Sequence, residues 1–149
     1  MTDITHKFEQ RDQTPIPEFT LQRKYIDLIK SGKKTVEGRI NSGGFKNFKV
    51  GDRVKFFDGK HPDYYVICEI VGIGRYMGFR QMLEAEGVTK MIPEAESLNE
   101  AVSIYNRIPS YPERAKRNGV ISLRIKVIDL SSEVTSGEIL TEDDNSDES

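Results

Sequence analysis

The sequence predicts an α+β fold: a small β-barrel of about six strands with two or three helices. Three observations lead to this prediction. Short segments rich in β-branched and aromatic residues recur along the chain, as is typical of strands. A few segments carry apolar residues at helical spacing. These helices interrupt the strands irregularly, which favours a barrel with helical insertions over a regularly alternating α/β sheet.

Length and composition fit one intracellular domain. The chain has 149 residues, of which 36% are hydrophobic and 31% are charged, as in globular proteins. Its apolar runs fall short of the roughly 18 residues that a membrane span needs, and its N-terminus lacks an apolar signal-peptide core. The single cysteine, Cys68, excludes an internal disulfide. We expect a monomer without membrane contact, cytoplasmic or, in a eukaryote, nuclear.

Three regions follow from the distribution of charge and apolar residues. Residues 1–16 are polar and predict a flexible lead-in, residues 17–128 form the domain, and residues 129–149 predict a disordered acidic tail. The tail holds eight acidic residues and no lysine or arginine. It would keep the protein soluble, cover a basic surface or bind a protein partner.

The first elements surround a tight turn. Residues 18–21 predict a strand, and residues 22–31 predict a helix with one apolar face. Gly32 suits a left-handed helix stop. A second strand then covers residues 34–40, and the paired glycines within residues 41–49 predict a mobile loop.

A hairpin follows. Residues 53–58 alternate in polarity and predict a strand, residues 59–63 form the turn, and residues 64–73 predict a second strand. Both faces of that second strand are apolar, so it should be central in the sheet. Cys68 is then expected to be a small core residue without chemistry.

The last third of the domain predicts two helices and a closing strand. One helix covers residues 78–86 and ends at Gly87. Another begins after Ser97, whose hydroxyl would cap a helix with a glutamate three positions on. Residues 109–119 are basic and predict an irregular segment, which is either a solvated loop, the favoured interpretation, or an extension of the binding surface. Residues 119–128 predict a strand.

Residues 32–39 combine basic side chains with two glycines at the junction of helix and strand. Glu37 and Arg39 lie two apart on a strand and should share one face as an ion pair. In a regular strand the Lys34 side chain would lie on the opposite face. A bulge or a position at the end of the strand is needed to place it with Glu37 and Arg39. A buried lysine there has its charged form disfavoured and could serve as a base, whereas an exposed lysine does nothing of the kind.

The domain's positive charge gathers around this motif. Residues 15–128 hold 20 of the 22 basic and 13 of the 24 acidic residues, a net charge of +7, and residues 21–55 alone carry the same net charge. Such a patch attracts phosphates, and the other interpretation is a solvated basic face. In the loop, Phe45 and Phe48 alternate with Lys46 and Lys49, which suits base stacking or simple anchoring to the core. His6 and His61 lack a second ligand at metal spacing, so we expect no metal and no cofactor.

Four positions of this motif, Gly32, Lys34, Glu37 and Arg39, fit a Gly-x-Lys-x-x-Glu-x-Arg signature, and the chain thereby resembles the ASCH domain family. Further landmarks of the family appear in order at residues 19–21, 50–57, 93, 98–105 and 119–125. The resemblance covers residues 17–128 and implies a PUA-like β-barrel, with the motif turn in a cleft between barrel and helices.

The resemblance also implies candidate activities. Some bacterial ASCH proteins are similar around the motif and deacetylate acetylated cytidine nucleosides with a Lys, a Thr and a distant Glu. Lys34 matches the lysine, but Glu37 stands where the threonine would be, and the distant acid is Glu94, with Glu86 and Glu96 as alternatives. Other members are implicated in RNA binding or RNA cleavage.

We therefore expect a cleft that binds RNA or a nucleotide-like ligand. The alternatives are a nucleoside amidohydrolase in which Lys34 activates water, and a protein-interaction module that uses the acidic tail. Whether the protein is an enzyme stays open at this point. Its candidate catalytic residues are Lys34, Glu37 and Glu94, and its candidate ligand-binding residues are Lys33, Lys34, Thr35, Glu37, Arg39 and Lys46.

Overall fold

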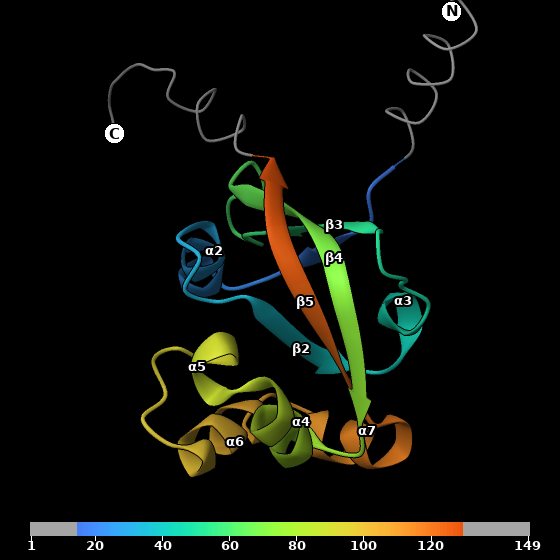
Figure 1. Ribbon diagram of the computed structural model, residues 1–149, viewed down its shortest axis with the longest axis vertical. Coiled ribbons are helices and arrows are strands. Elements are labelled where there is room, and N and C mark those ends of the chain that lie inside the picture. Colours follow the sequence, from blue (N-terminus) through green and yellow to red (C-terminus); the bar gives the residue numbers. More distant parts are fainter. Residues whose placement is uncertain (1–14, 130–149) are drawn as a thin grey trace, which may run out of the picture.

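The computed structural model describes residues 15–129; the predicted lead-in (1–16) and acidic tail (129–149) lie almost wholly outside this part. Within it, five strands form one curled, half-barrel sheet (Figure 1). The predicted α+β class is confirmed, with five strands instead of about six. The strands are β1 (Glu18–Thr20), β2 (Val36–Ile40), β3 (Arg53–Phe57), β4 (Tyr65–Tyr76) and β5 (Val120–Asp129).

The described part of the chain also contains six helices, more than the two or three expected. Four of them, α4 to α7, follow one another between β4 and β5 and gather at one end of the sheet (Figure 1). Within residues 15–129 every helix is too short or too polar to cross a bilayer. The helices are α2 (Arg23–Lys30), α3 (Gly43–Lys46), α4 (Phe79–Glu86), α5 (Val88–Met91), α6 (Leu98–Asn106) and α7 (Tyr111–Asn118).

The two longest strands, β4 and β5, are the spine of the sheet. The strand order is β1-β3-β4-β5-β2, so β4 is central, as predicted. β1 runs parallel to β3, and the other neighbours are antiparallel. Register shifts at Ile67/Cys68 and Ile70/Gly72 interrupt the ladder between β4 and β5. Such bulges increase local twist, which helps the ribbon to curl.

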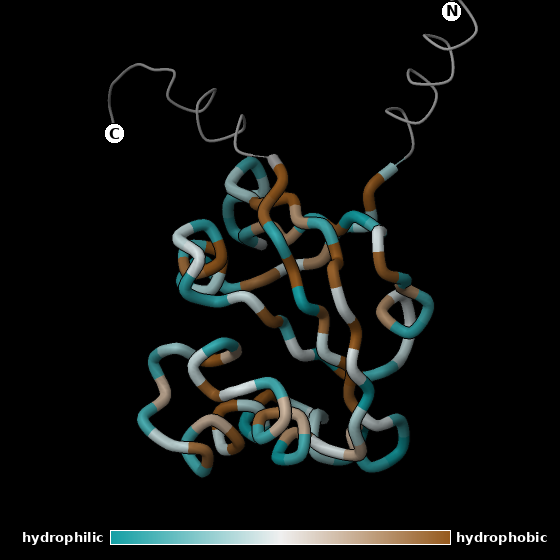
Figure 2. The backbone as a smooth tube through the Cα atoms, in the orientation of Figure 1, coloured by the Kyte–Doolittle hydropathy of each residue, from teal (hydrophilic) through white to brown (hydrophobic). Residues whose placement is uncertain are grey.

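Two hydrophobic clusters hold the fold together. One lies within the curl of the sheet, between the strands and α2, and includes the fully buried Cys68, Val54 and Phe56. The other joins β2 and the start of β5 to the helices α4 to α7. Figure 2 shows apolar residues recurring along the strands and on the inner sides of the helices. Cys68 is therefore a core residue, as predicted, and burial raises the pKa of its thiol.

Three local predictions need correction. Most of the segment 109–119 is helix α7 (Tyr111–Asn118) instead of a loop. Pro112 near its first position, Glu113 in its first turn and Gly119 just after its end are all favourable helix signals. The pattern was hard to see because Ala115 is the helix's single buried residue. The short helix α5 was missed altogether.

The loop after β2 is also more ordered than predicted. It contains the helical turn α3, and its two phenylalanines pack against Phe19, with ring centroids 4.0 Å away for Phe45 and 6.1 Å for Phe48. Phe48 is buried. Anchoring to the core therefore accounts for both rings, and base stacking is not needed to explain them.

A buried carboxylate ties the helical layer to the sheet. Glu86, the last residue of α4, accepts two bonds from Arg124 at 2.9 and 2.8 Å, one from the Tyr76 hydroxyl at 2.6 Å and one from Ser122 Oγ at 2.7 Å. The Arg124 guanidinium is the first cause that holds the pKa of Glu86 at about 2. Gly74 lies directly beneath these groups.

Gly74→Ala should destabilise the protein because no room exists for a methyl group there. An added Cβ would lie 2.7 Å from Ser122 Oγ, 2.7 Å from the Tyr76 hydroxyl and 2.8 Å from Glu86. We expect a loss of about 1 to 3 kcal/mol in the free energy of unfolding, measured in urea. Gly59→Ala is the control, since its nearest contact would be an ordinary 3.6 Å. Equal stability of the two variants would contradict the proposed packing.

Stability should fall with acidification in part through Glu86. Its pKa in the folded protein, about 2, lies below its ordinary value of 4.5. Its contribution is therefore present above pH 4.5 and is lost as the pH falls toward 2. Glu86→Gln should cost about 2 kcal/mol near neutral pH and reduce the slope of stability against pH below about 5. Urea unfolding at several pH values checks this, and an unchanged slope in the variant would exclude Glu86 as a source.

Candidate ligand-binding cleft

A cleft of about 1180 Å³ lies between the barrel and the helical layer. Its walls come from α2, β2, α6, the turn between α6 and α7, and the turn between β3 and β4. Apolar and aromatic side chains alternate there with charged ones. The charged lining residues are the basic Arg23, Lys24, Lys34, Arg39, Lys60 and Arg107 and the acidic Glu37, Asp58, Glu94 and Glu100.

The motif reaches this cleft because α2 ends at a tight turn. Gly32 adopts a φ of 83°, in the left-handed region predicted for it. The amides of Lys33 and Lys34 then donate to the Leu28 carbonyl, each at 3.0 Å, and the Thr35 amide donates to Lys90 O. Lys34 thus lies just before β2 begins. This strand-end position lets its side chain join those of Glu37 and Arg39.

The Lys34 ammonium is buried with a complete set of acceptors. The residue is 2% exposed. Its Nζ donates to Val36 O at 2.8 Å and to Met91 O at 2.6 Å, and it lies 3.1 Å from Glu37 Oε1. Burial lowers the pKa of Lys34, and the charge of Glu37 opposes this. Three acceptors match the three N–H bonds of the charged form, which therefore fits this site.

Glu37 is held between two cations. Its Oε1 faces Lys34 and its Oε2 accepts a 2.6 Å bond from Arg39 Nε. Burial alone would raise the pKa of Glu37, but the charges of Lys34 and Arg39 outweigh burial and hold that pKa below its ordinary value. The carboxylate is ionised, and both of its oxygens are occupied by protein donors.

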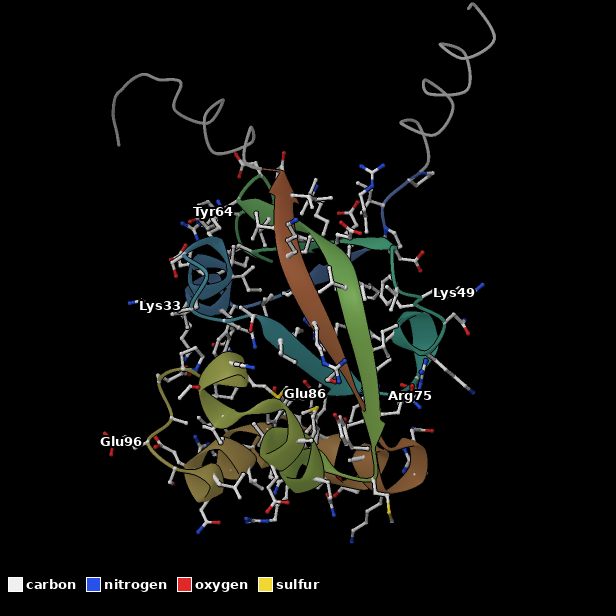
Figure 3. The ribbon with its side chains drawn as sticks, in the orientation of Figure 1. Lys33, Lys49, Tyr64, Arg75, Glu86 and Glu96 are labelled. Atoms are coloured by element: carbon white, nitrogen blue, oxygen red, sulfur yellow. The ribbon has the colours of Figure 1, made fainter. Side chains whose placement is uncertain are left out.

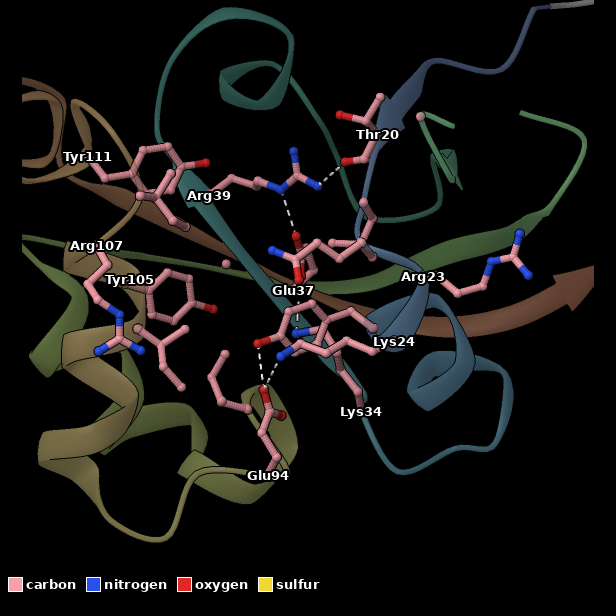
Figure 4. Close-up of a pocket in the computed structure, with 18 of the residues that line it drawn as sticks. Thr20, Arg23, Lys24, Lys34, Glu37, Arg39, Glu94, Tyr105, Arg107 and Tyr111 are labelled. Atoms are coloured by element: carbon pink, nitrogen blue, oxygen red, sulfur yellow. Dashed lines mark hydrogen bonds and ion pairs between the residues drawn. The ribbon is translucent and has the colours of Figure 1, made fainter. Parts of the chain in front are cut away.

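Arg39 is fixed at one side and open at the other. Besides Glu37, it bonds the Thr20 carbonyl through Nη2 at 2.8 Å, and its guanidinium lies over the rings of Phe45 (4.9 Å) and Phe56 (5.6 Å). Among the described residues, no acceptor bonds its Nη1. Figure 4 shows this guanidinium at the cleft wall beside Thr20.

Tyrosines supply the flat surfaces of the cleft. Tyr105 and Tyr111 line the cleft at α6 and α7, and both stack on Phe79 of α4, with ring centroids 4.5 and 5.7 Å away. Burial raises the pKa of Tyr105 well above its ordinary value. Its hydroxyl bonds none of the described residues and points into the cleft (Figure 4).

Glu94 closes the cleft from the helical layer. Its Oε2 accepts a 2.6 Å bond from the Tyr25 hydroxyl and lies 3.5 Å from Lys24 Nζ, both on α2. Burial tends to raise the pKa of Glu94, but the bond from Tyr25 and the nearby Lys24 leave it below its ordinary value. Of the three acids considered from the sequence, Glu94 alone lines the cleft, since Glu86 bonds Arg124 and Glu96 points to solvent (Figure 3).

The structure gathers only some of the predicted site residues. Lys34, Glu37, Arg39 and Glu94 line one cleft, whereas the exposed Lys33, Thr35 and Lys46 do not. Figure 3 shows Lys33 pointing away from the protein. Within residues 15–129 no cluster of three His, Cys, Asp or Glu side chains is arranged to hold a metal.

Sequence reasoning missed the aromatic and rim residues of the cleft. Tyr25 and Tyr105 occupy apolar faces of predicted helices, so the pattern indicated core residues. Their hydroxyl groups were the one available hint, since a buried tyrosine usually needs a polar partner. The sequence does not single out Tyr111 because the segment that forms α7 is predicted as a loop, and it does not single out Arg107 because that residue lies at the C-terminal end of α6, where a basic side chain is common.

Comparison with protein-family models identifies the family of the chain. A family model described as "ASCH domain" matches residues 19–129. No functionally curated protein matches the sequence. Hypothetical protein PH0355 is 36% identical, with a TM-score of 0.68, and the alignment covers 76% of this chain and all of that one. Protein PF0455 from Pyrococcus furiosus is 31% identical, with a TM-score of 0.63, over 77% of this chain and 99% of that one.

A more distant structure shares the fold alone. ASCH from Zymomonas mobilis is 13% identical, has a TM-score of 0.51, and aligns over 83% of this chain and 80% of that one. The ASCH resemblance seen in the sequence is therefore confirmed by the family model, and the curled sheet with its helical layer is a fold shared with the Zymomonas mobilis protein.

Lys34→Met should destabilise the fold strongly. It leaves the Val36 and Met91 carbonyls without their donor and removes one of the two cations that hold Glu37. Breaking a buried pair from one side costs about 3 to 5 kcal/mol, measurable by urea unfolding. The double variant Lys34→Met, Glu37→Gln should lose less than the sum of the two single losses. Additive losses would mean that the two side chains are not coupled.

Proposed function

Since the chain belongs to the ASCH domain family, we propose that its cleft binds RNA or a nucleotide-like ligand. One observation carries the proposal: the cleft presents two unused donors, Arg39 Nη1 and the Tyr105 hydroxyl, between apolar and aromatic walls. A nucleotide offers matching groups, since its base is flat and its phosphate and base edges accept hydrogen bonds.

Arg39 is suited to the role because it is oriented before the ligand arrives. Its bonds to Glu37 and Thr20 use Nε and Nη2, and its contacts with two phenylalanine rings restrict its side chain. A donor held in place loses little conformational freedom on binding. Lys60 and Arg107, which line the same cleft, add positive charge.

The geometry ranks amidohydrolysis second. A lysine that activates water must accept a proton, and a charged Lys34 with three acceptors around it has no lone pair to do so. Glu37 is a weak base because two cations hold its oxygens. What keeps the alternative in view is that a buried, perturbed Lys–Glu pair lies in the cleft.

Tyr105→Phe tests the proposal most cleanly. The hydroxyl bonds no described residue, so its removal should leave the free energy of unfolding nearly unchanged. We expect affinity for a labelled short single-stranded RNA, measured by fluorescence anisotropy, to fall about five- to tenfold, as for one lost hydrogen bond. Tyr65→Phe is the control, because Tyr65 lies on β4 outside the lining residues.

Two results would count against binding in this cleft. One is the absence of RNA binding by the wild type; the other is unchanged affinity in both Tyr105→Phe and Arg39→Gln. Release of cytidine from acetylated cytidine by the wild type, followed by chromatography, would instead support the amidohydrolase.

A further inference from the structure

Most basic groups inside the cleft already have acidic partners. Arg23 pairs with Asp58 at 2.9 Å, Lys24 lies 3.5 Å from Glu94, and Lys34 and Arg39 share Glu37. Paired charges attract a polyanion weakly, because each carboxylate cancels much of its partner's field. The cleft is therefore equipped to hold one nucleotide rather than a run of phosphates.

Unpaired positive charge lies next to the cleft, where α3, the end of β4 and α7 meet. Arg114 Nη2 lies 3.4 Å from Ser42 Oγ, and Arg75 Nη2 donates to Lys46 O at 3.1 Å. Both acceptors are neutral, and neither guanidinium forms an ion pair within residues 15–129. The charges are thus positioned without being neutralised. We call Lys46, Lys49, Arg75 and Arg114 the basic ridge.

The ridge is continuous with the cleft. Arg39, in the cleft wall, lies over the Phe45 ring of α3, the helix that carries Lys46. Tyr111, which also lines the cleft, lies 5.7 Å from the Arg114 guanidinium. α3 and α7 lie on the same side of the molecule (Figure 1). Figure 3 shows Lys49 pointing outward on that side, and Arg75 lies beside α3, where it bonds the Lys46 carbonyl.

We propose that the cleft takes one unpaired nucleotide of a single-stranded RNA, and that the phosphates beside it lie along the basic ridge. The inference rests on the proposed function and narrows its ligand to a polynucleotide. A duplex fits less well, because its bases are paired and stacked and none is free to enter a cleft. A mononucleotide would leave the ridge unused.

The test is a length series measured on the full chain. Anisotropy titrations compare a labelled three-nucleotide RNA with a labelled twelve-nucleotide RNA at several salt concentrations. We expect the longer RNA to bind about tenfold tighter. Its salt dependence should also be steeper by about two logarithmic units per decade, as for three more phosphate contacts on a single strand. Equal affinity for both lengths would overturn the inference.

Substitutions in the basic ridge test whether it is the source of the tighter binding of the longer RNA. Arg75→Gln with Arg114→Gln should remove the advantage of the longer RNA while leaving the shorter RNA's affinity unchanged. Lys46→Gln with Lys49→Gln should act in the same direction; neither lysine side chain bonds a described residue, so folding is not at risk. Arg53→Gln with Lys126→Gln, both exposed on the sheet, is the matched control.

The outcomes separate the two proposals. If the short RNA binds and length adds nothing, or if the ridge variants weaken both RNAs equally, the inference fails and cleft binding stands. If neither RNA binds, both fail. Tighter binding of a twelve-base-pair duplex than of the single strand would also overturn the inference.

Discussion

The buried ammonium of Lys34 is the interaction on which the cleft depends. A charge removed from water must be surrounded by acceptors, and the fold supplies them from both of its layers: Val36 O and Glu37 from the sheet and Met91 O from the helices. One side chain therefore sets where β2, α5 and the cleft floor lie relative to one another. The ion pair with Lys34 orients the Glu37 carboxylate, and the bond from Arg39 to that carboxylate orients Arg39.

The same logic explains which parts of the site the sequence could predict. The motif residues 34, 37 and 39 are close in the chain, so a turn followed by a strand was enough to place them together. Glu94 was reachable only through the family resemblance, because it comes from the far side of the cleft. Tyr105 was beyond reach, since residues on an apolar helix face look alike whether they fill a core or line a cleft. Tyr111 was beyond reach because the helix that it begins, α7, has almost no apolar pattern.

The fold was predictable where periodicity was strong. β4, β5, α4 and α6 follow clear apolar patterns, and Ser97 caps α6 through Glu100 N at 3.0 Å as its sequence predicts. The helix α7 could not be predicted because its single buried residue, Ala115, leaves almost no apolar pattern in the sequence. The hydrogen-bond network of Glu86 could not be predicted for another reason. Its four polar residues come from α4, β4 and β5 and meet only in the folded sheet, so no local sequence spacing indicates them.

The pairing between β4 and β5 continues to the end of the sheet where the helices α4 to α7 lie. Tyr76, at the end of β4, pairs with Val120, at the start of β5, so the whole of residues 77–119 leaves the sheet and returns to adjacent points. Such a segment is an insertion between two paired strand ends, so changes within it need not alter the sheet. Several contacts attach it to the rest of the domain. They include the Glu86 and Glu94 carboxylates, and the Lys90 and Met91 carbonyls, which are main-chain atoms that any residue provides. Substitutions on the exposed side chains of this segment that line the cleft can therefore change one of its walls while the barrel strands and the buried Lys34 stay the same.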